Sequence, residues 1–341
     1  GFLKPYMGTL TDADPYLHPT LKLTGTATGR LSCANPNLQQ VPREGPLKRA
    51  FVPRPGMDGY GIVDLEQAEL RIAALLSEDE KLAETLNSED LHRTGAAQVL
   101  GKPPEEVTSN ERKAFKKVIF GLLYGGTPEG IAGKADISVQ ETVRIIQWIG
   151  ANFKSLSTWM KHQRVLAEES GEIETLFGRK RSVRHLLMEG QRNKVARLSV
   201  NTPIQSVASD CMLIVTATLD QLLREDRLKA RILFGVHDSL LAEYAEGEGQ
   251  LLAHRVQRSF EAIADSPLGQ TSLFRYLPLN GTLVLGKSWA AVESTSEGYD
   301  PQMSVTVSSL GGQYREHAVS LGRDQDDDDF DLDLDDEDED E

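Results

Sequence analysis

The sequence predicts an α+β fold in which strands near both ends of the globular region flank a long helical segment. Asp58–Ser77 opens with a short apolar run that ends at Asp64 and then changes to helical spacing. Arg231–Tyr244 holds two apolar runs on either side of Gly235–Ser239, a pattern typical of a β-hairpin. Residues 78–171 have mostly helical periodicity, with breaks expected at Pro103 and Pro104, around residues 125–128 and at Gly150.

Length and composition indicate a globular protein. The 341 residues, 39% of them hydrophobic, suffice for one large domain or two to three ordinary ones. Fourteen acidic residues and no basic ones lie in residues 324–341, and subtracting their charge from the total of −15 leaves −1. The remainder is therefore nearly neutral and can carry local basic surfaces for nucleic acid.

Cysteine content and hydropathy indicate a cytosolic protein without a membrane segment. Cys33 and Cys211 are too few for a disulfide framework or a cysteine zinc cluster and fit a reducing compartment. No apolar run approaches 18 residues and no signal peptide precedes the domain. The chain starts at Gly1 without an initiator Met, so we expect a processed product or an excerpt of a longer chain.

The N-terminal region is expected to be extended and polar. Gly1–Leu23 is rich in Pro, Gly and Asp and shows no strong periodicity. Thr26–Pro42 is dense in turn formers and amides, and by composition alone it is a polar loop. Four of its side chains are of the kind that contact groove edges and phosphates: Arg30, Asn37, Gln39 and Gln40.

Asp64 is expected at the end of a strand and just before a helix, where a carboxylate can face an open site. The alternative is a helix cap, since Asp is a favoured N-cap and Gln67 lies three residues further on, as in a capping box. The local sequence favours the cap.

Residues 111–126 predict a helix with a functional stripe. Arg112, Lys116, Phe120 and Tyr124 follow one another at i, i+4 spacing and so share one face. The stripe is about 18 Å long, roughly the length of a nucleoside triphosphate. Its cationic end suits a polyphosphate, and its aromatic end can stack on a base or sugar. The alternative is an ordinary amphipathic helix with a solvated basic end.

Further candidate residues lie along the rest of the chain. His92 is placed at a helix start, where a lone His is more often structural. The basic segment Thr175–Leu186, which includes Arg179, either binds phosphate or stays solvated. A long helix over Arg192–Leu223 would present three polar side chains on one face: Arg197, Asn201 and Gln205. The tip of the expected hairpin would hold His237 and Asp238.

Two strand-end carboxylates, a basic and aromatic helix and several polar loops suggest metal-assisted phosphoryl transfer. Six segments in order resemble the polymerase domain of family A DNA polymerases, the family of bacterial DNA polymerase I and many phage replicative enzymes. The segments are Thr26–Pro42, Asp64–Arg71, Arg112–Gly125, Thr175–Arg181, Asn201–Gln205 and Val236–Asp238. The resemblance covers roughly residues 17–292. It implies a right-hand fold with an antiparallel-sheet palm and helical fingers.

The resemblance also implies roles for single residues. Asp64, Asp238 and the backbone of Leu65 match the binding positions of two Mg²⁺ ions, for which Mn²⁺ is a possible substitute. Around the incoming dNTP it places Glu69, which excludes a ribose 2′-OH, and with it Gln67, His92, Arg112, Lys116, Phe120 and Tyr124. Lys116 also matches the position proposed to protonate pyrophosphate, which makes it a third catalytic candidate. The implied DNA contacts are Arg30, Asn37, Gln40, Arg179, Arg197, Asn201, Gln205 and His237.

The chain departs from the family pattern at three positions. Ser239 stands where a Glu usually follows the second aspartate, and two aspartates are still enough to hold two ions. Ile119 replaces an Asn, which should alter packing more than chemistry. Phe120 stands where other members have Tyr, which in this family goes with poorer use of dideoxynucleotides.

The resemblance divides the chain into six parts and leaves two family domains outside it. We expect an N-terminal connection at 1–16, palm at 17–77 and 199–292, fingers at 78–198, a linker at 293–323 and a disordered acidic tail at 324–341. The thumb and the exonuclease domain of the family precede the matched region and cannot be encoded in residues 1–16. We expect weak duplex grip, and either a partner chain that supplies those domains or a larger parent protein. A split phage polymerase is the preferred explanation.

The acidic tail has two interpretations. It is either a disordered solubilising segment or, with Phe330, Leu332 and Leu334 among its acids, a docking segment for a replisome partner or a DNA mimic. The predicted activity is DNA-templated addition of dNTPs to a primer 3′ end, in the bacterial cytosol or a phage-infected host cell. One alternative is a noncatalytic or partner-dependent replisome subunit that acts through the tail. Another is a single-subunit RNA polymerase, which Glu69 and the segment TGRLS disfavour.

Overall fold

A computed structural model describes residues 4–8, 10, 14–42, 46–236, 238–293, 299–310 and 315–317. The helices are α1 Lys4–Met7, α2 Ala68–Ser77, α3 Glu80–Ser88, α4 Leu91–Leu100, α5 Ser109–Leu123, α6 Pro128–Ala135, α7 Val139–Asn152, α8 Lys154–Ser170, α9 Arg184–Met188, α10 Arg192–Glu225, α11 Gly249–Glu261 and α12 Trp289–Val292. The strands are β1 Thr20–Lys22, β2 Ser32–Ala34, β3 Gly59–Leu65, β4 Glu172–Glu174, β5 Lys180–Ser182, β6 Arg231–Val236, β7 Ser239–Tyr244, β8 Asn280–Gly286, β9 Met303–Ser308 and β10 Arg315–His317. This mixture of helices and antiparallel strands confirms the α+β prediction.

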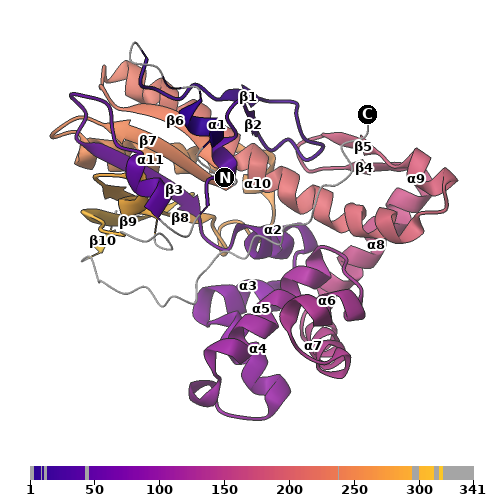
Figure 1. Cartoon of the computed structure of the whole chain (residues 1–341). Coiled ribbons are helices and arrows are strands. Elements are labelled where there is room, and N and C mark those ends of the chain that lie inside the picture. The colour runs from indigo at the N-terminus through magenta and orange to yellow at the C-terminus, as the bar shows by residue number, and fades with distance from the viewer. Residues whose placement is uncertain are drawn as a thin grey trace.

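The main sheet has six strands in the order β10-β9-β8-β3-β7-β6, and all neighbours are antiparallel. Strand β3 is buried almost throughout because both of its faces are covered. Val63 points into the large core that includes α10 and α11, and the adjacent Ile62 points into a second cluster around Trp289 of α12. The predicted hairpin forms as β6 and β7, and it places β7 directly beside β3 (Figure 1).

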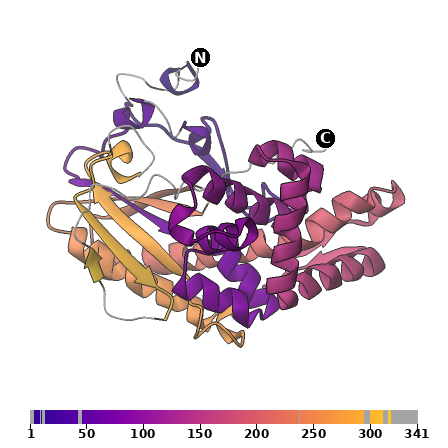
Figure 2. The same ribbon diagram turned by 90° about the horizontal axis from the view of Figure 1, so that it is seen from below.

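The helical region, α2 to α8, lies beside the sheet (Figures 1 and 2). Helix α5 is at its centre and packs against α4, α6 and α7. Phe115 and Ile119 of α5 are fully buried, because they lie on the faces that these helices cover. Helix α10 links this region to the sheet, since it packs against α8 at one side and α11 at the other.

Helix α10 is long and apolar enough to cross a membrane by length and composition alone, the one such helix in the described part of the chain. The sequence analysis, which found no apolar run approaching 18 residues, did not predict that this helix would be long and apolar enough to do so. The helix packs against α2, α8 and α11 and carries the buried Asp210. These contacts are those of a core helix.

Two local predictions, a helix break at Gly150 and a loop after Val292, are wrong. Gly150 lies inside α7, and the helix ends instead at Asn152, followed by the C-cap residue Phe153, whose N–H donates to the Ile149 carbonyl (2.8 Å). Packing of Ile149 into the core outweighs the small cost of glycine. The region after Val292, expected to be loop-like, contains strand β9, whose Val305 and Val307 are buried while the residues beside them are partly exposed.

The N-terminal region also has more structure than expected. Residues 4–7 form a short helix, since the Tyr6 ring packs edge-on against Phe51 (centroids 6.4 Å apart). The segment read as a polar loop contains β2, which pairs with β1 in a small hairpin, and the 3-10 helix Leu38–Gln40. The acidic tail lies outside the described residues.

Candidate active site

Asp64 and Asp238 lie at the same end of two adjacent strands. In the register of β3 and β7, Asp64 is directly opposite Ser239, the neighbour of Asp238. The Leu65 N–H also donates to the Asp238 carbonyl (3.4 Å). Both aspartates are partly exposed. The fold therefore brings together two carboxylates that are far apart in the sequence.

The helix-cap interpretation of Asp64 is wrong. Helix α2 begins at Ala68, and the residue in the N-cap position is Gln67, which has a left-handed backbone (φ 48°) and makes no side-chain cap hydrogen bond. Asp64 lies within β3, three residues before this position. Asp64 thus lies near the end of a central strand, opposite Ser239 of β7.

Oxygen ligands such as these suit Mg²⁺, which favours carboxylates and keeps several waters. The side chain of Leu65 is buried, so only its backbone can face the site. Within the described residues there is no group of three or more His, Cys, Asp or Glu side chains that could hold a metal. The donor set fits a carboxylate-bound Mg²⁺ that draws its remaining ligands from water and substrate.

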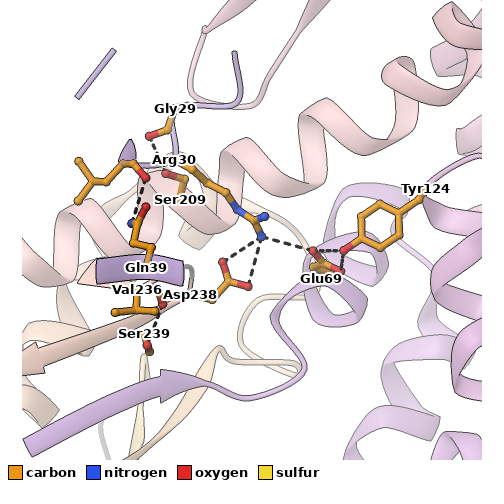
Figure 3. Close-up of polar contacts among 10 residues, drawn as sticks. Gly29, Arg30, Gln39, Glu69, Tyr124, Ser209, Val236, Asp238 and Ser239 are labelled. Carbon is orange, nitrogen blue, oxygen red and sulfur yellow. Dashed lines mark hydrogen bonds and ion pairs between the residues drawn. The ribbon is translucent and has the colours of Figure 1, made fainter. Parts of the chain in front are cut away.

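Arg30 joins Asp238 to the helical region. Its Nη2 donates to Asp238 Oδ1 (3.2 Å) and lies 3.6 Å from Glu69 Oε1 (Figure 3). Glu69 in turn accepts a short hydrogen bond from the Tyr124 hydroxyl at the end of α5. Burial, and then the Glu69 carboxylate, raise the pKa of Tyr124, so its hydroxyl remains a donor. A continuous polar chain thus runs from α5 to the β6–β7 turn.

The backbone before Arg30 is fixed against α10. The Gly29 carbonyl accepts a hydrogen bond from Ser209 Oγ (2.8 Å). Gly29 has φ +83°, and a Cβ there would lie 2.5 Å from the guanidinium of Arg179. Arg179 itself binds Asp210 through Nη2 and Oδ1 (2.7 Å). Glycine is required here for both its backbone angle and its lack of a side chain.

The stripe helix forms as predicted and begins with a capping box. The Glu111 N–H donates to Thr108 Oγ1 (3.3 Å), and the Thr108 N–H donates to Glu111 Oε2 (2.8 Å). Hydrogen bonds from Lys102 and then from Thr108 lower the pKa of Glu111 to about 2. An anionic cap also suits the helix dipole. This start sets the rotation of the stripe.

The cationic part of the stripe is less open than expected. Arg112 is buried, and its Nε donates to Asp90 Oδ2 (2.7 Å), whereas Lys116 is partly exposed. Burial acts to raise the pKa of Asp90, but hydrogen bonds from Arg112 and the Arg93 backbone outweigh it and lower the pKa. Asp90 also caps α4 by accepting from the backbone of residues 92 and 93. Arg112 therefore fastens α5 to α4.

His92 lies at the start of α4 as predicted, and its ring is buried against the stripe. Its ring centroid is 6.2 Å from that of Phe120, which stacks in turn on Tyr124 (6.5 Å, 28° between planes). Burial and, after it, the charge of Lys116 lower the pKa of His92 to about 3. His92 is consequently neutral at physiological pH.

Comparison with known proteins places this site in a family. The model of DNA polymerase family A matches residues 2–291. The chain belongs to DNA polymerase family A. It is 33% identical over 290 residues to DNA polymerase I of Chloroflexus aurantiacus and 34% identical over 284 residues to the thermostable DNA polymerase I of Thermus thermophilus. These alignments cover 83% and 81% of this chain.

A solved structure shares the fold of this family A chain. The POL domain of Pol1 from M. smegmatis, in complex with DNA primer-template and dNTP, has a TM-score of 0.76 and 30% identity over 85% of this chain. The chain spans 30% and 33% of the lengths of the two curated relatives and 51% of this solved chain.

In this family A chain, the polar segment Thr26–Pro42 is hydrogen-bonded to the main sheet through Gln39. Gln39 Nε2 donates to the Leu31 carbonyl (3.1 Å) and the Gly235 carbonyl of β6 (3.0 Å). Asn37 caps the 3-10 helix by accepting from the Gln39 N–H (3.0 Å), whereas Gln40 is exposed. Gln39 therefore has a structural role, and Asn37 contributes its side-chain oxygen to a cap.

The predicted polar face of α10 is present. Arg197, Asn201 and Gln205 lie one turn apart, and each is partly exposed. Gly125, with φ +69°, packs against this helix, since a Cβ there would lie 2.6 Å from Arg197 Cα. The end of the stripe helix thus meets α10 near the start of this face. His237 lies outside the described residues.

Sequence reasoning missed three residues that organise the site. Asp210 binds Arg179, Ser209 binds the carbonyl of Gly29, and Asp90 binds Arg112. An acid in the apolar half of a long helix, as at Asp210, was a usable signal, because burying a charge is costly without a partner. Ser239 has a local role as well, since its Oγ donates to the Val236 carbonyl (2.8 Å) and closes the turn that carries Asp238.

Proposed function

We propose that this family A chain catalyses DNA-templated addition of dNTPs to a primer 3′ end. The observation that carries the proposal is that Asp64, near the end of β3, lies beside Asp238, just before the start of β7, next to a helix with cationic and aromatic side chains. The family and the solved neighbour, whose title includes primer-template and dNTP, support it.

Asp64, Asp238 and the Leu65 carbonyl would hold Mg²⁺, with Mn²⁺ as a possible substitute. Two such ions would make a primer hydroxyl more acidic and neutralise charge on a departing pyrophosphate. The chain positions the aspartates through the β3–β7 register and through the turn that Ser239 closes. This supports activity without a Glu at position 239.

The dNTP would lie along the stripe helix. Arg112 and Lys116 would contact its triphosphate, and Lys116 would give a proton to pyrophosphate. Neutral His92 would donate a hydrogen bond beside them. Phe120 would support the base, with Tyr124 near the template base. Glu69, which accepts a hydrogen bond from Tyr124, would leave no room for a ribose 2′-OH. The exposed Gln67 would also lie beside the dNTP.

Primer and template would lie across the palm and along α10. Arg30 and Gln205 would report the shape of the new base pair from its minor groove, where acceptors are shared by all four pairs. The remaining DNA contacts would position the backbone and the neighbouring bases: Asn37, Gln40, Arg179, Arg197, Asn201 and His237. Arg179 would have to leave or share its pair with Asp210 to reach DNA.

The domain boundaries also remain a proposal. Residues 17–77 and 199–292 would form the palm, and residues 78–198 the fingers, with β9 extending the palm sheet beyond the expected boundary at Val292. A partner chain that supplies a thumb would add to the grip on the duplex. A role of the acidic tail in replisome contacts, a phage origin and a place in the bacterial or infected-cell cytosol remain predictions.

Template-directed incorporation tests the proposal. Four primer-templates that differ only in the first template base are each given one dNTP at a time with Mg²⁺. We expect extension only by the complementary dNTP. Extension that ignores the template, or no extension at high protein concentration and low salt with the chain folded, would contradict polymerase activity of this chain alone. The second outcome favours a partner-dependent or noncatalytic subunit.

A further inference from the structure

Arg30 holds one of the two aspartates of the site. Its Nη2 lies 3.2 Å from Oδ1 and 3.5 Å from Oδ2 of Asp238, so the guanidinium faces both carboxylate oxygens (Figure 3). The same nitrogen lies 3.6 Å from Glu69 Oε1. One cation thus bridges two carboxylates in the DNA-free chain. About a quarter of each of the Arg30 and Asp238 side chains is exposed (25% and 26%), so the pair is partly shielded from water.

The position of Arg30 is imposed by the fold. The preceding carbonyl, that of Gly29, is bound by Ser209 of α10, and the carbonyl of Arg30 itself accepts from Thr26 Oγ1 (2.8 Å). Anchors on both sides of Arg30 restrict its backbone. They fix the point from which the side chain extends, so the guanidinium starts within reach of Asp238.

A divalent cation bound to Asp238 would be repelled by Arg30, because the positively charged guanidinium already lies at the same carboxylate oxygens. The guanidinium and the metal would compete for the same two carboxylate oxygens, and in a partly buried site the repulsion between the two cations is only weakly screened. Occupation of Asp238 by a metal therefore requires the guanidinium to move. Glu69, 3.6 Å from the same nitrogen, is a second carboxylate to which Arg30 can turn without losing a charged partner.

We propose that Arg30 is a placeholder cation for the metal site: it occupies Asp238 in the DNA-free chain and must release it before a divalent ion binds there. The inference deepens the proposed function, since it concerns regulation of the same site. Arg30 acts through Asp238 as a positioning residue. Acceptors on a bound duplex would draw the guanidinium away, so DNA and metal would bind with positive coupling. The device would keep the metal site closed until primed DNA is in place.

Metal binding by the free chain tests the proposal without any activity measurement. Mn²⁺ is titrated into DNA-free protein, and free ion is followed by its electron paramagnetic resonance signal. Proteins compared are wild type, Arg30→Gln, Arg30→Lys and the double variant Arg30→Gln with Asp238→Asn. The acidic tail is the same in all of them, so ions that it binds cancel in the comparison. Arg231→Gln is a matched control, because Arg231 binds Glu243 (2.7 Å) on the same hairpin at its other end.

We expect Arg30→Gln to bind Mn²⁺ about tenfold more tightly than wild type, the size of a lost charged contact. The gain should vanish in the double variant and be absent in Arg231→Gln. Arg30→Lys keeps the charge but lacks the planar guanidinium, so its Mn²⁺ affinity should increase less. If Arg30→Gln fails to fold, the comparison of Arg30→Lys with wild type tests the proposal. A merely structural role of Arg30 would lower metal affinity on substitution.

Equal Mn²⁺ affinity in wild type and Arg30→Gln, including no detectable site in either, would overturn the proposal, as would a gain that persists without Asp238. Failure of the proposed function is distinguishable from these outcomes. It would appear as absent template-directed incorporation while the gain in Mn²⁺ affinity remained.

Discussion

Gly29→Ala adds only one methyl group, but we expect it to destabilise the protein strongly. Gly29 has φ +83°, a left-handed conformation that costs an alanine about 1–2 kcal/mol. The added Cβ would also lie 2.5 Å from Nη2 and 2.6 Å from Cζ of Arg179. The end of a long side chain can move away at little cost, but Arg179 would then lose its hydrogen bond to Asp210 (2.7 Å).

The second contribution can be bounded from exposure. A hydrogen bond to a charged group is worth about 1.5–3 kcal/mol. The Arg179 side chain is 36% exposed and that of Asp210 is 11% exposed, so solvent compensates part of this and about 1–2 kcal/mol remains. The expected total loss for Gly29→Ala is about 2–4 kcal/mol of unfolding free energy.

Gly56 provides a matched control, because it has nearly the same backbone angle (φ +85°) and nothing within 4 Å of the added Cβ. Gly56→Ala should therefore show the backbone cost alone. Chemical denaturation of both variants and wild type measures the difference, which we expect to be about 1–2 kcal/mol. Equal losses for the two variants would refute the role of the Arg179–Asp210 pair. A Gly29 variant as stable as wild type would also refute the strained backbone.

Three further substitutions follow from the site. His92 has a folded-state pKa of about 3, below its unfolded value, so the unfolded chain binds the proton first. The contribution of neutral His92 to stability is complete above about pH 6.5 and falls as the pH drops toward 3. In that pH window, the melting temperature of His92→Gln should therefore depend less on pH than that of wild type. Parallel melting profiles for the two proteins would contradict this. Tyr124→Phe removes the donor to a largely buried Glu69 and should cost about 1–3 kcal/mol in denaturant titrations, with an unchanged midpoint arguing against that hydrogen bond. Ser239→Ala loses the turn contact to Val236 and should cost about 1 kcal/mol while leaving nucleotide incorporation within a few-fold of wild type; loss of incorporation would mean that the hydroxyl does more than close the turn.

Much of the fold was predictable from the sequence because its periodic segments are long. The hairpin at Arg231–Tyr244 and the helix over Arg192–Leu223 formed as expected, and the strand ending at Asp64 formed as well. Shorter elements were missed because their stability is not local. Strand β9 depends on pairing with β8, and the N-terminal helix depends on contacts of Tyr6 with distant residues.

The candidate site was predictable as a set of residues but not as a set of contacts. The spacing of Arg112, Phe120 and Tyr124 placed them on one face of a helix, and the structure has them there. Nothing in the sequence could show that Arg30 lies on Asp238, 208 positions away. The local pattern even favoured the helix cap at Asp64, because only the pairing of β3 with β7 reveals what the carboxylate faces.

Asp64→Asn and Asp238→Asn provide the most direct test of the account, measured as single-turnover incorporation of one complementary dNTP with Mg²⁺. Asp58→Asn is the matched control, because Asp58 lies beside the other end of β3 and binds Lys287 there. We expect each site variant to lose at least about 10³-fold in rate, and Asp58→Asn to remain within a few-fold of wild type. Site variants that fold and retain the wild-type rate would contradict the claim that the two strand-end aspartates carry the chemistry.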